Sequence, residues 1–283
     1  MTEVAKTVVV RTRAELREAL AAAARPVGLV PTMGWLHDGH RSLMARARAD
    51  DATSVVSIFV NPRQFNEAAD YTRYPRDEAR DLAICQEEGI DIVFLPPVEE
   101  IYPPGFDSVV SVGAIGRVLE GAARPGHFDG VATVVAILFN LVGAERAYFG
   151  QKDAQQVMII RRMATDLALP TAVIACPTVR EADGLAMSSR NVHLTPEQRV
   201  AASVLRRALL AGRAAHESGE GSAAAIRTAA QAELDREPLA ATEYVSVADA
   251  ATLDELQLVD GPALLSVAVR FGSTRLIDNE PLA

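Results

Sequence analysis

The chain has 283 residues, which is enough for one large or two modest domains with cores of their own. Its formal net charge of −9 makes it a poor general binder of nucleic acid, which needs a basic surface. Hydrophobic residues make up 49% of the chain, yet no apolar run reaches the ~18 residues of a membrane span. The first residues also lack the pattern of a signal peptide, so we expect a cytoplasmic protein without membrane contact.

Residues 7–175 alternate short apolar strands with helices. Apolar or β-branched runs predict strands at residues 7–11, 27–30, 54–60, 91–95, 146–149 and 171–175. Helical spacing predicts helices at residues 12–24, 40–50, 77–88, 131–142 and 153–167. The first of these helices begins with a capping-box pattern of Thr12 and Glu15. This alternation predicts an α/β fold, a doubly wound, Rossmann-like parallel sheet formed by residues 1–176.

The pattern changes near Pro177. A polar segment at residues 180–191 leads to two predicted helices, roughly at residues 196–216 and 222–236. Three β-rich runs follow at residues 242–248, 263–269 and 274–278. Helices followed by a small sheet predict a separate C-terminal α+β domain, which we place at residues 177–283.

Two cysteines, Cys85 and Cys176, lie inside separate apolar patterns. They are too few for a disulfide framework and too far apart in sequence for a CxxC metal or redox motif. We therefore expect two buried free thiols.

The stretch Pro31–His40 reads PTMGWLHDGH and follows directly on a predicted parallel strand. Ligands of such sheets bind at the carboxyl ends of the strands. Asp38 or Gly39 is the expected N-cap of the next helix. Both histidines, His37 and His40, would then meet backbone N–H groups and the positive end of a helix dipole, an arrangement that suits phosphate. A metal-binding histidine pair and plain surface polarity are the alternatives for this motif on its own.

Five further blocks follow this histidine motif in the sequence. They are SIFVNPRQF (57–65), YPR (74–76), RPGHFDGV (124–131), FGQKDAQQ (149–156) and VREADGLAMSSRN (179–191). A His-x-Gly-His pattern after a strand is the signature of the nucleotidylyltransferase superfamily, and the six blocks in this order and spacing resemble its pantothenate synthetase branch. The resemblance implies a two-step ligation. The carboxylate of pantoate attacks the α-phosphate of ATP, which gives pantoyl adenylate and pyrophosphate, and the amine of β-alanine then displaces AMP to give pantothenate.

The resemblance also implies which residues surround the triphosphate. These are His37, His40, Lys152, Ser188, Ser189 and Arg190. For the rest of the ATP site it adds Met33, Gly150, Asp153 and Val179. Such donors suit a reaction in which negative charge builds up on phosphate, and a phosphate would favour the protonated form of a histidine. Asp153 could also serve as a helix N-cap, and Met33 could simply be a packing residue.

A second set of residues is implied for pantoate. It comprises Gln64, Gln156, Met33 and Asn61, with Tyr74, Arg124 and His127 as further site candidates. A glutamine side chain can both donate and accept, which suits hydroxyl groups together with a carboxylate. The Gly/Pro-rich loop of RPGHFDGV could close over the reactants and protect the mixed anhydride from water. Outside these blocks, lone glutamines would be interpreted as surface residues.

Mg²⁺ is expected with ATP, bound chiefly by phosphates and water, and Asp81 is the candidate carboxylate ligand. The family also implies a homodimer, with the N-terminal sheet edge as a candidate interface, and a C-terminal domain that swings to cover ATP. The sequence departs from the family pattern at Gln151, Ala154, Trp35 and Arg63. These departures leave open the substrate affinity and the loop packing more than the type of reaction.

Three other functions are weighed against this one. A nucleotidylyltransferase with a phosphate-bearing acceptor would need more cations than Gln64 and Gln156 provide. A nucleotide-binding sensor would not need donors for a leaving pyrophosphate. An aminoacyl-tRNA synthetase shares the histidine motif but is disfavoured by the acidic charge and the short chain.

Overall fold

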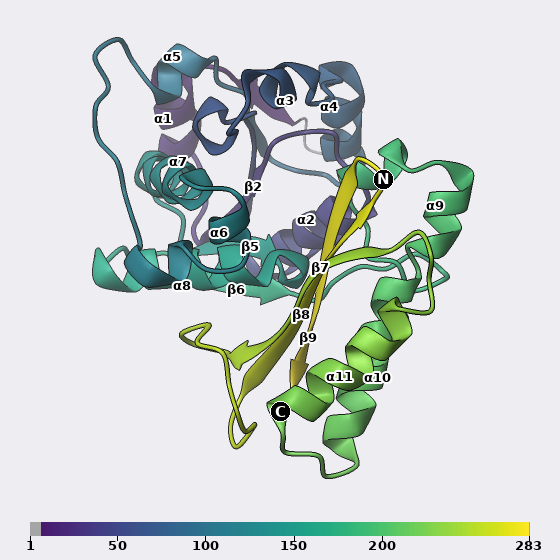
Figure 1. The fold of residues 1–283 in the computed structure, drawn as a ribbon. Helices are drawn as coiled ribbons and strands as arrows, with labels where there is room; N and C mark the ends of the chain where they lie inside the picture. The colour runs from purple at the N-terminus through teal and green to yellow at the C-terminus, as the bar shows by residue number, and fades with distance from the viewer. Residues whose placement is uncertain (1–6, 283) are drawn as a thin grey trace. The chain divides into compact units, whose positions relative to one another are not determined.

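The computed structural model describes residues 7–282, which form two compact units (Figure 1). Unit 1 consists of residues 7–150 and 155–176, and unit 2 of residues 151–154 and 177–282. The short segment Gln151–Ala154 therefore belongs to unit 2, although the chain returns to unit 1 directly after it. Across these described residues, no helix combines the length and the apolar character that a membrane crossing would require.

Unit 1 is built on a six-stranded sheet in which each neighbouring pair runs parallel. Its strands are β1 (Val8–Val10), β2 (Val27–Thr32), β3 (Thr53–Ile58), β4 (Ile92–Phe94), β5 (Arg146–Gly150) and β6 (Ala172–Cys176). They lie in the order β1-β4-β3-β2-β5-β6. From β2 the chain adds β3 and then β4 on one side, where β1 forms the edge next to β4. It later returns to pair β5 with the other side of β2, and β6 follows β5. The predicted doubly wound parallel sheet is confirmed, with its switch point between β2 and β5.

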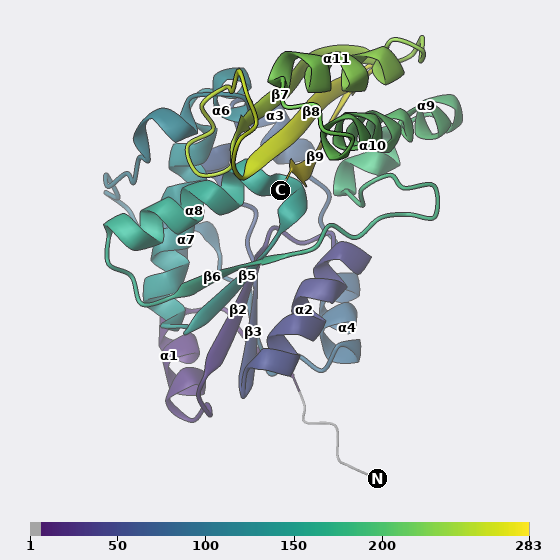
Figure 2. The same ribbon diagram turned by 90° about the horizontal axis from the view of Figure 1, so that it is seen from below.

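Helices cover both faces of this sheet (Figure 2). On one face lie α1 (Arg13–Ala21), α7 (His127–Val142) and α8 (Ala154–Asp166), and on the other α2 (Asp38–Asp50) and α4 (Glu78–Glu87). Consecutive residues of β3 pack into the hydrophobic cores on opposite faces of the sheet: Val55 packs with the α7 side and Val56 with the α2 side. Such double burial is why the strand reads as a continuous apolar run. Short helices complete the unit: α3 (Ala68–Arg73), α5 (Val98–Ile101), α6 (Glu120–Ala123), η1 (Pro62–Gln64) and η2 (Gly113–Gly116).

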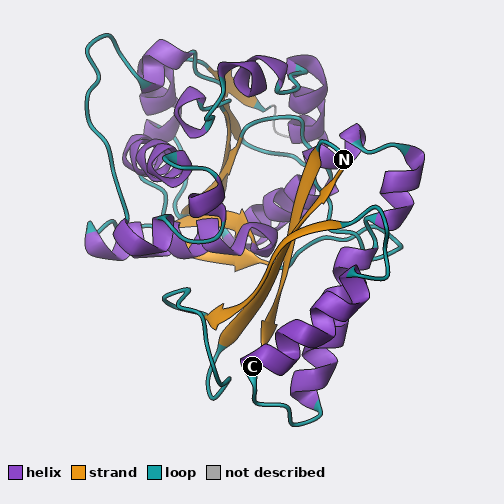
Figure 3. Cartoon of the chain, in the orientation of Figure 1, coloured by secondary structure: helices purple, strands orange, loops and turns teal. Residues whose placement is uncertain are grey.

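Unit 2 contains a three-stranded antiparallel sheet in the order β7-β8-β9, formed by β7 (Ala241–Asp249), β8 (Ala263–Phe271) and β9 (Thr274–Leu282). Helices α10 (Val204–Glu217) and α11 (Ala223–Leu234) pack along it and share its hydrophobic core (Figure 3). The remaining helices of this unit are α9 (Pro196–Ala201), η3 (Gln151–Asp153) and η4 (Ser189–His193). The predicted α+β character of the C-terminal part is confirmed.

Several predicted element boundaries differ from the structure, and two of these differences have local reasons. Strand β2 runs through Pro31, where an end was expected. β5 pairs only with Gly28 and Leu29 of β2, so no neighbouring strand requires an N–H from Pro31. The helix expected at residues 196–216 is two helices, because the Ser203 hydroxyl donates to the Val200 carbonyl (2.8 Å) at the break.

Both cysteines lie in the core of unit 1, as expected. Burial raises the pKa of the Cys85 thiol to about 12 and also raises the pKa of Cys176. Because the thiolate is the reactive form, we expect neither thiol to react with a water-soluble disulfide reagent in the folded protein at mildly alkaline pH. Both should react once a denaturant is added. Rapid labelling of the native protein would show that this core opens.

Candidate active site

The loop after β2 is shaped by a buried carboxylate from another helix. Gly34 and Trp35 both have positive φ, at 82° and 52°, which turns successive backbone N–H groups toward one point. The N–H groups of Trp35 and Leu36 each donate to a carboxylate oxygen of Asp81, both at 2.8 Å. Asp81 lies on α4 and is only 2% exposed. It therefore fixes the conformation of the segment that leads into the histidine motif.

Arg80, next to Asp81, completes this anchor. Its guanidinium donates to the Leu36 carbonyl (2.6 Å) and lies 5.0 Å from the centre of the Trp35 ring. Trp35, a departure from the family pattern, is thus packed through a cation–π contact.

Both oxygens of Asp81, the predicted magnesium ligand, accept hydrogen bonds from backbone amides. Among residues 7–282, moreover, no three His, Cys, Asp or Glu groups stand together to hold a metal ion.

The two histidines cap the helix that follows. The N-cap of α2 is His37, not Asp38 or Gly39. Its Nδ1 accepts from the Gly39 N–H (3.1 Å), while Nδ1 of His40 accepts from the His37 N–H (3.2 Å). A backbone N–H can only donate, so both Nδ1 atoms lack a proton and each ring carries its proton on Nε2.

This reciprocal cap makes a group of preoriented donors. The rings of His37 and His40 lie 4.1 Å apart, and both are partly exposed. Their Nε2–H groups join the positive end of the α2 dipole at the carboxyl edge of the sheet. Neutral N–H donors and a helix N-terminus together suit an anion such as phosphate.

The η1 turn carries the residues predicted to bind pantoate, and their side chains form one chain of hydrogen bonds. Asn61 is 1% exposed, and its Nδ2 donates to Gln64 Oε1 and to the Gly130 carbonyl, both at 3.0 Å. The Tyr102 hydroxyl donates to Asn61 Oδ1 (2.7 Å). Because Asn61 engages Oε1 of Gln64, the amide nitrogen of Gln64 points away and donates to the Met33 sulfur (2.9 Å). Asn61 thus orients Gln64, which presents its N–H groups beside Met33.

We expect Tyr102→Phe to remove the hydrogen bond between the Tyr102 hydroxyl and Asn61, and so to disturb the hydrogen-bonded chain that orients Gln64. Loss of one partly buried hydroxyl donor should lower the free energy of unfolding by about 1 kcal/mol and raise KM for pantoate, the substrate predicted for this turn, several-fold, while KM for ATP stays within about twofold. Tyr148→Phe is the matched control, since this buried hydroxyl bonds Asp51 instead. Steady-state kinetics with each substrate varied would check this, and parallel changes in both KM values, or the same pattern in the control, would contradict it.

Arg124 and His127 are brought against the backbone of Gln64. A guanidinium only donates, so Nε2 of His127 accepts from Arg124 (3.1 Å) and the ring proton sits on Nδ1. That Nδ1–H donates to the Gln64 carbonyl (2.8 Å), which also accepts from Arg124 Nη2 (3.2 Å). The two side chains predicted as site candidates therefore help to hold the turn that carries Gln64 in place.

Aromatic rings border the same turn. Tyr74 meets the ring of Phe65 edge to face at 5.8 Å, so this predicted candidate contributes to an apolar wall. Arg63, another departure from the family pattern, lies over the rings of Tyr102 (4.9 Å) and Phe106 (4.6 Å). It also donates to the Phe106 carbonyl (3.2 Å), so its role is to tie η1 to the segment after α5.

The tandem glutamines at the start of α8 have different surroundings. Gln156, predicted to bind pantoate, is partly exposed. Gln155 is 7% exposed, and its amide bonds the Glu120 N–H and the carbonyls of Ile115 and Val118. Gln155 was not expected to matter, because a polar residue in a helix gives no sequence signal of burial. Gly150 ends β5, the strand beside β2, and so lies at the switch point of the sheet.

In unit 2, Lys152 and Asp153 lie on the turn η3. The Lys152 ammonium is 3.3 Å from the Asp153 carboxylate, and the lysine side chain is 16% exposed. Since η3 ends at Asp153 and α8 starts at the next residue, Asp153 remains well placed for its alternative role at the helix start.

The segment 179–191 of unit 2 folds back on itself. The Met187 N–H donates to the Val179 carbonyl (3.0 Å), and the Ser188 hydroxyl caps η4 by accepting from the Arg190 N–H (3.2 Å). Val179 and Ser188 thus have structural contacts of their own. Within residues 7–282 we find no hydrogen bond or ion pair of the Ser189 hydroxyl or the Arg190 guanidinium, and both remain available to an anion.

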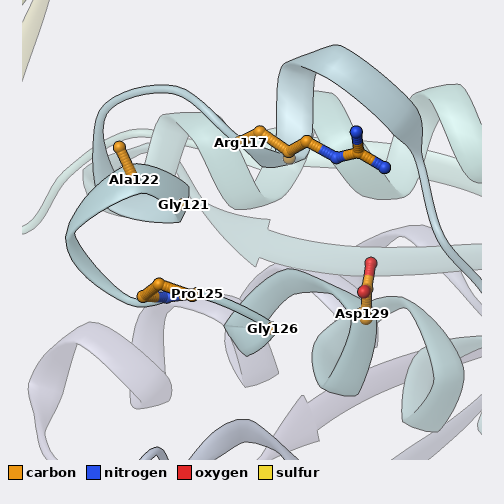
Figure 4. A pocket seen from close by; sticks show the side chains of 7 residues that line it. Arg117, Gly121, Ala122, Pro125, Gly126 and Asp129 are labelled. Carbon is orange, nitrogen blue, oxygen red and sulfur yellow. The ribbon is translucent and has the colours of Figure 1, made fainter.

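A surface pocket lies between η2 and the start of α7 (Figure 4). It is lined by Gly116, Arg117, Gly121, Ala122, Pro125, Gly126 and Asp129. Arg117 and Asp129 supply its charged side chains, and none of the predicted site residues lines it. Three of its lining residues, Pro125, Gly126 and Asp129, belong to the RPGHFDGV loop that also carries the site candidates Arg124 and His127.

Comparison with known proteins gives one consistent family. Residues 8–281 match the family model described as pantoate-β-alanine ligase. The chain is 58% identical over 271 residues to the pantothenate synthetase of Roseiflexus sp. (strain RS-1), an alignment that covers 96% of this chain and 98% of the relative. It is 54% identical over 274 residues to the pantothenate synthetase of Agrobacterium fabrum, covering 95% and 94%.

Solved structures agree over nearly the same length. The crystal structure of pantothenate synthetase from Thermus thermophilus has a TM-score of 0.92 and 50% identity, and the match covers 97% of this chain and 99% of that one. The pantoate-β-alanine ligase of Francisella tularensis, complexed with β-γ ATP and β-alanine, has a TM-score of 0.78 and 31% identity, with 97% of each chain covered.

Proposed function

Because the chain belongs to the pantoate–β-alanine ligase family and is an ATP-dependent ligase of that kind, we propose that it makes pantothenate through a pantoyl-adenylate intermediate. The pantoate carboxylate attacks the α-phosphorus of ATP, and pyrophosphate leaves. The neutral amine of β-alanine then attacks the acyl carbon, loses its extra proton to solvent, and AMP leaves. The observation that carries this proposal is the reciprocal cap of His37 and His40, which fixes both imidazoles at the N-terminus of α2, after strand β2.

The problem in the first step is negative charge, and the proposed ATP site answers it with fixed donors. His37 and His40 would donate through Nε2 to phosphate oxygens, and Lys152 and Arg190 would offset the charge on the leaving pyrophosphate. The two imidazoles are held by their cap bonds before substrate binds, which lowers the cost of reorganisation during reaction. The other proposed ATP contacts are Met33, Gly150, Asp153, Val179, Ser188 and Ser189. That residues 177–283 act as a domain that closes over the nucleotide also remains a prediction.

For pantoate, we propose that Gln64 donates to the carboxylate or a hydroxyl group, since Asn61 already engages its Oε1. Gln156 would make the second polar contact, with Phe65 and Tyr74 as apolar wall. Asn61, Arg124 and His127 act here chiefly by holding Gln64. ATP and β-alanine as substrates are supported by the related Francisella tularensis ligase, which is complexed with β-γ ATP and β-alanine.

Mg²⁺ is proposed to accompany ATP, held by phosphates and water. Asp81, whose two oxygens also accept from backbone amides, remains the candidate carboxylate ligand. A homodimer and a cytoplasmic location remain predictions. The exposed edge strand β1, with Val8 48% and Val9 37% exposed, is consistent with an interface there, and sedimentation would test it.

We expect Gln64→Ala to raise KM for pantoate at least about tenfold and to leave KM for ATP within about twofold, because it removes the oriented amide donor of the acid pocket. Initial-rate kinetics with each substrate varied in turn would measure both constants. Gln86→Ala, an exposed glutamine on α4, is the control and should behave like the unaltered protein. Equal weakening of pantoate and ATP would refute the pocket assignment.

Omission of single substrates tests the proposed order of steps. Pyrophosphate should appear with ATP and pantoate alone, in an amount close to one per enzyme, and AMP should be released only when β-alanine is added. The rival nucleotidylyltransferase reaction would form pyrophosphate only when a phosphate-bearing acceptor is supplied and none with pantoate, and that outcome would reject the proposal.

A further inference from the structure

The turn that carries Lys152 is held by a residue far away in the sequence. Asn279 lies on β9 and is 5% exposed. Its Nδ2 donates to the carbonyls of Gln151 and Lys152, both at 2.9 Å, and its Oδ1 accepts from Gln151 Nε2 (3.2 Å). All of these residues belong to unit 2. The Asn279 side chain thus bonds two consecutive backbone carbonyls of η3, which lie 127 and 128 residues away in the chain.

Asparagine is well matched to this task. Two carbonyls need two N–H donors in one plane, and the Gln151 amide needs one acceptor, which is the set that a single carboxamide provides. An aspartate at this position would retain the acceptor but face two carbonyl oxygens without any donor. Gln151, where the family usually has an acidic residue, can donate to Asn279 only because it is an amide. The departure at Gln151 therefore completes the contact.

The neighbours of Asn279 tie other elements to the same strand. Asp278, 2% exposed, pairs with Arg180 at 2.6 and 3.1 Å, at the start of the segment that leads to Arg190. Glu280 pairs with Arg206 and Arg213 of α10. Only Asn279 of these three bonds η3, so its effect on that turn can be separated from the general stability of β9.

We propose that Asn279 is a positioning residue for Lys152, an inference that rests on the proposed function of that lysine. Lysine occurs only at positions 6 and 152 among the 28 basic residues of the sequence, so the compact ammonium at 152 is an unusual choice for this chain. A lysine side chain is long and flexible, and a fixed backbone restricts the volume that its ammonium can reach. By holding the Lys152 carbonyl, Asn279 sets the point from which the ammonium approaches phosphate.

A double-mutant cycle in the full-length protein tests this inference. Asn279→Asp should slow pantoate-dependent exchange of pyrophosphate into ATP about tenfold, with KM for pantoate unchanged. The control Glu280→Gln breaks ion pairs of the same strand without touching η3 and should stay within twofold. In a Lys152→Ala background, Asn279→Asp should cost less than twofold, since the group that it positions is gone. The same tenfold loss in that background, or in the control, would overturn the inference.

A readout independent of activity separates this inference from the proposed function. Protein labelled with [15N]lysine should give amide signals from two lysines only, and Asn279→Asp should shift or broaden the Lys152 signal while Glu280→Gln leaves it in place. An unmoved Lys152 signal would reject the positioning role even if Lys152→Ala is inactive. Conversely, full exchange activity of Lys152→Ala would reject the proposed role of the lysine. If Asn279→Asp does not fold, Asn279→Leu removes the same bonds without burying a charge and replaces it in both measurements.

Discussion

Replacing His40 with asparagine is expected to slow adenylation at least about 100-fold and to leave the unfolding midpoint almost unchanged. An asparagine places a polar atom near the position of Nδ1, so it can still accept from the His37 N–H and keep the cap. It places nothing at the position of Nε2, and so the donor to phosphate is lost. The rate of pyrophosphate exchange and a thermal melt would measure the two effects separately.

His40→Gln should keep the cap and recover part of the exchange rate. A glutamine at this position can accept from the N-cap N–H through Oε1, as Gln198 does at the start of α9, while its amide nitrogen reaches toward the position of Nε2. His216→Asn, on α10 of unit 2, is a control that should change neither quantity. If His40→Asn exchanged pyrophosphate at a normal rate, the histidine motif would have a purely structural role.

Lys152→Ala should cost at least about 100-fold in adenylation, or about 2.7 kcal/mol of transition-state stabilisation. The loss should fall on the first step, because the pyrophosphate whose charge the ammonium offsets has left before β-alanine reacts. Lys152→Arg should recover part of the rate, since it keeps the charge but changes the shape of the donor. Lys6→Ala is the matched control, as it removes the other lysine of the chain.

Each half-reaction of Lys152→Ala can be followed by itself. Exchange of labelled pyrophosphate into ATP reports adenylation, and the reaction of added pantoyl adenylate with β-alanine reports amide formation. The expected pattern is a large loss in exchange with amide formation within a fewfold of the unaltered enzyme. A similar loss in both steps would mean that Lys152 maintains the site as a whole and does not act on the leaving group.

Features that depend on neighbouring residues could be predicted from the sequence. The double burial of Val55 and Val56 is visible in an uninterrupted apolar run, and the cap formed by Thr12 and Glu15 follows from their spacing. The place of the histidine motif also follows, since a loop after a parallel strand lies at the carboxyl edge of the sheet.

The remaining parts of the site depend on contacts between distant segments. Asp81 bonds a loop 46 residues earlier in the chain, and Asn279 bonds a turn 128 residues earlier. No local sequence pattern predicts either of these hydrogen bonds. The N-cap was misplaced because an imidazole is not among the side chains that usually cap helices, although His37 does so here. The orientation of the Gln64 amide depends on Asn61 and on the partly buried Tyr102, and no property of glutamine itself reveals it.

An isotope measurement tests the adenylation most directly. Pantoate carrying ¹⁸O in both carboxylate oxygens would be converted with ATP and β-alanine, and the products analysed by mass spectrometry. Attack of the carboxylate on the α-phosphorus predicts one ¹⁸O in the phosphate of AMP and one in the new amide carbonyl. Unlabelled AMP, or label found in pyrophosphate or inorganic phosphate, would contradict activation of pantoate as its adenylate.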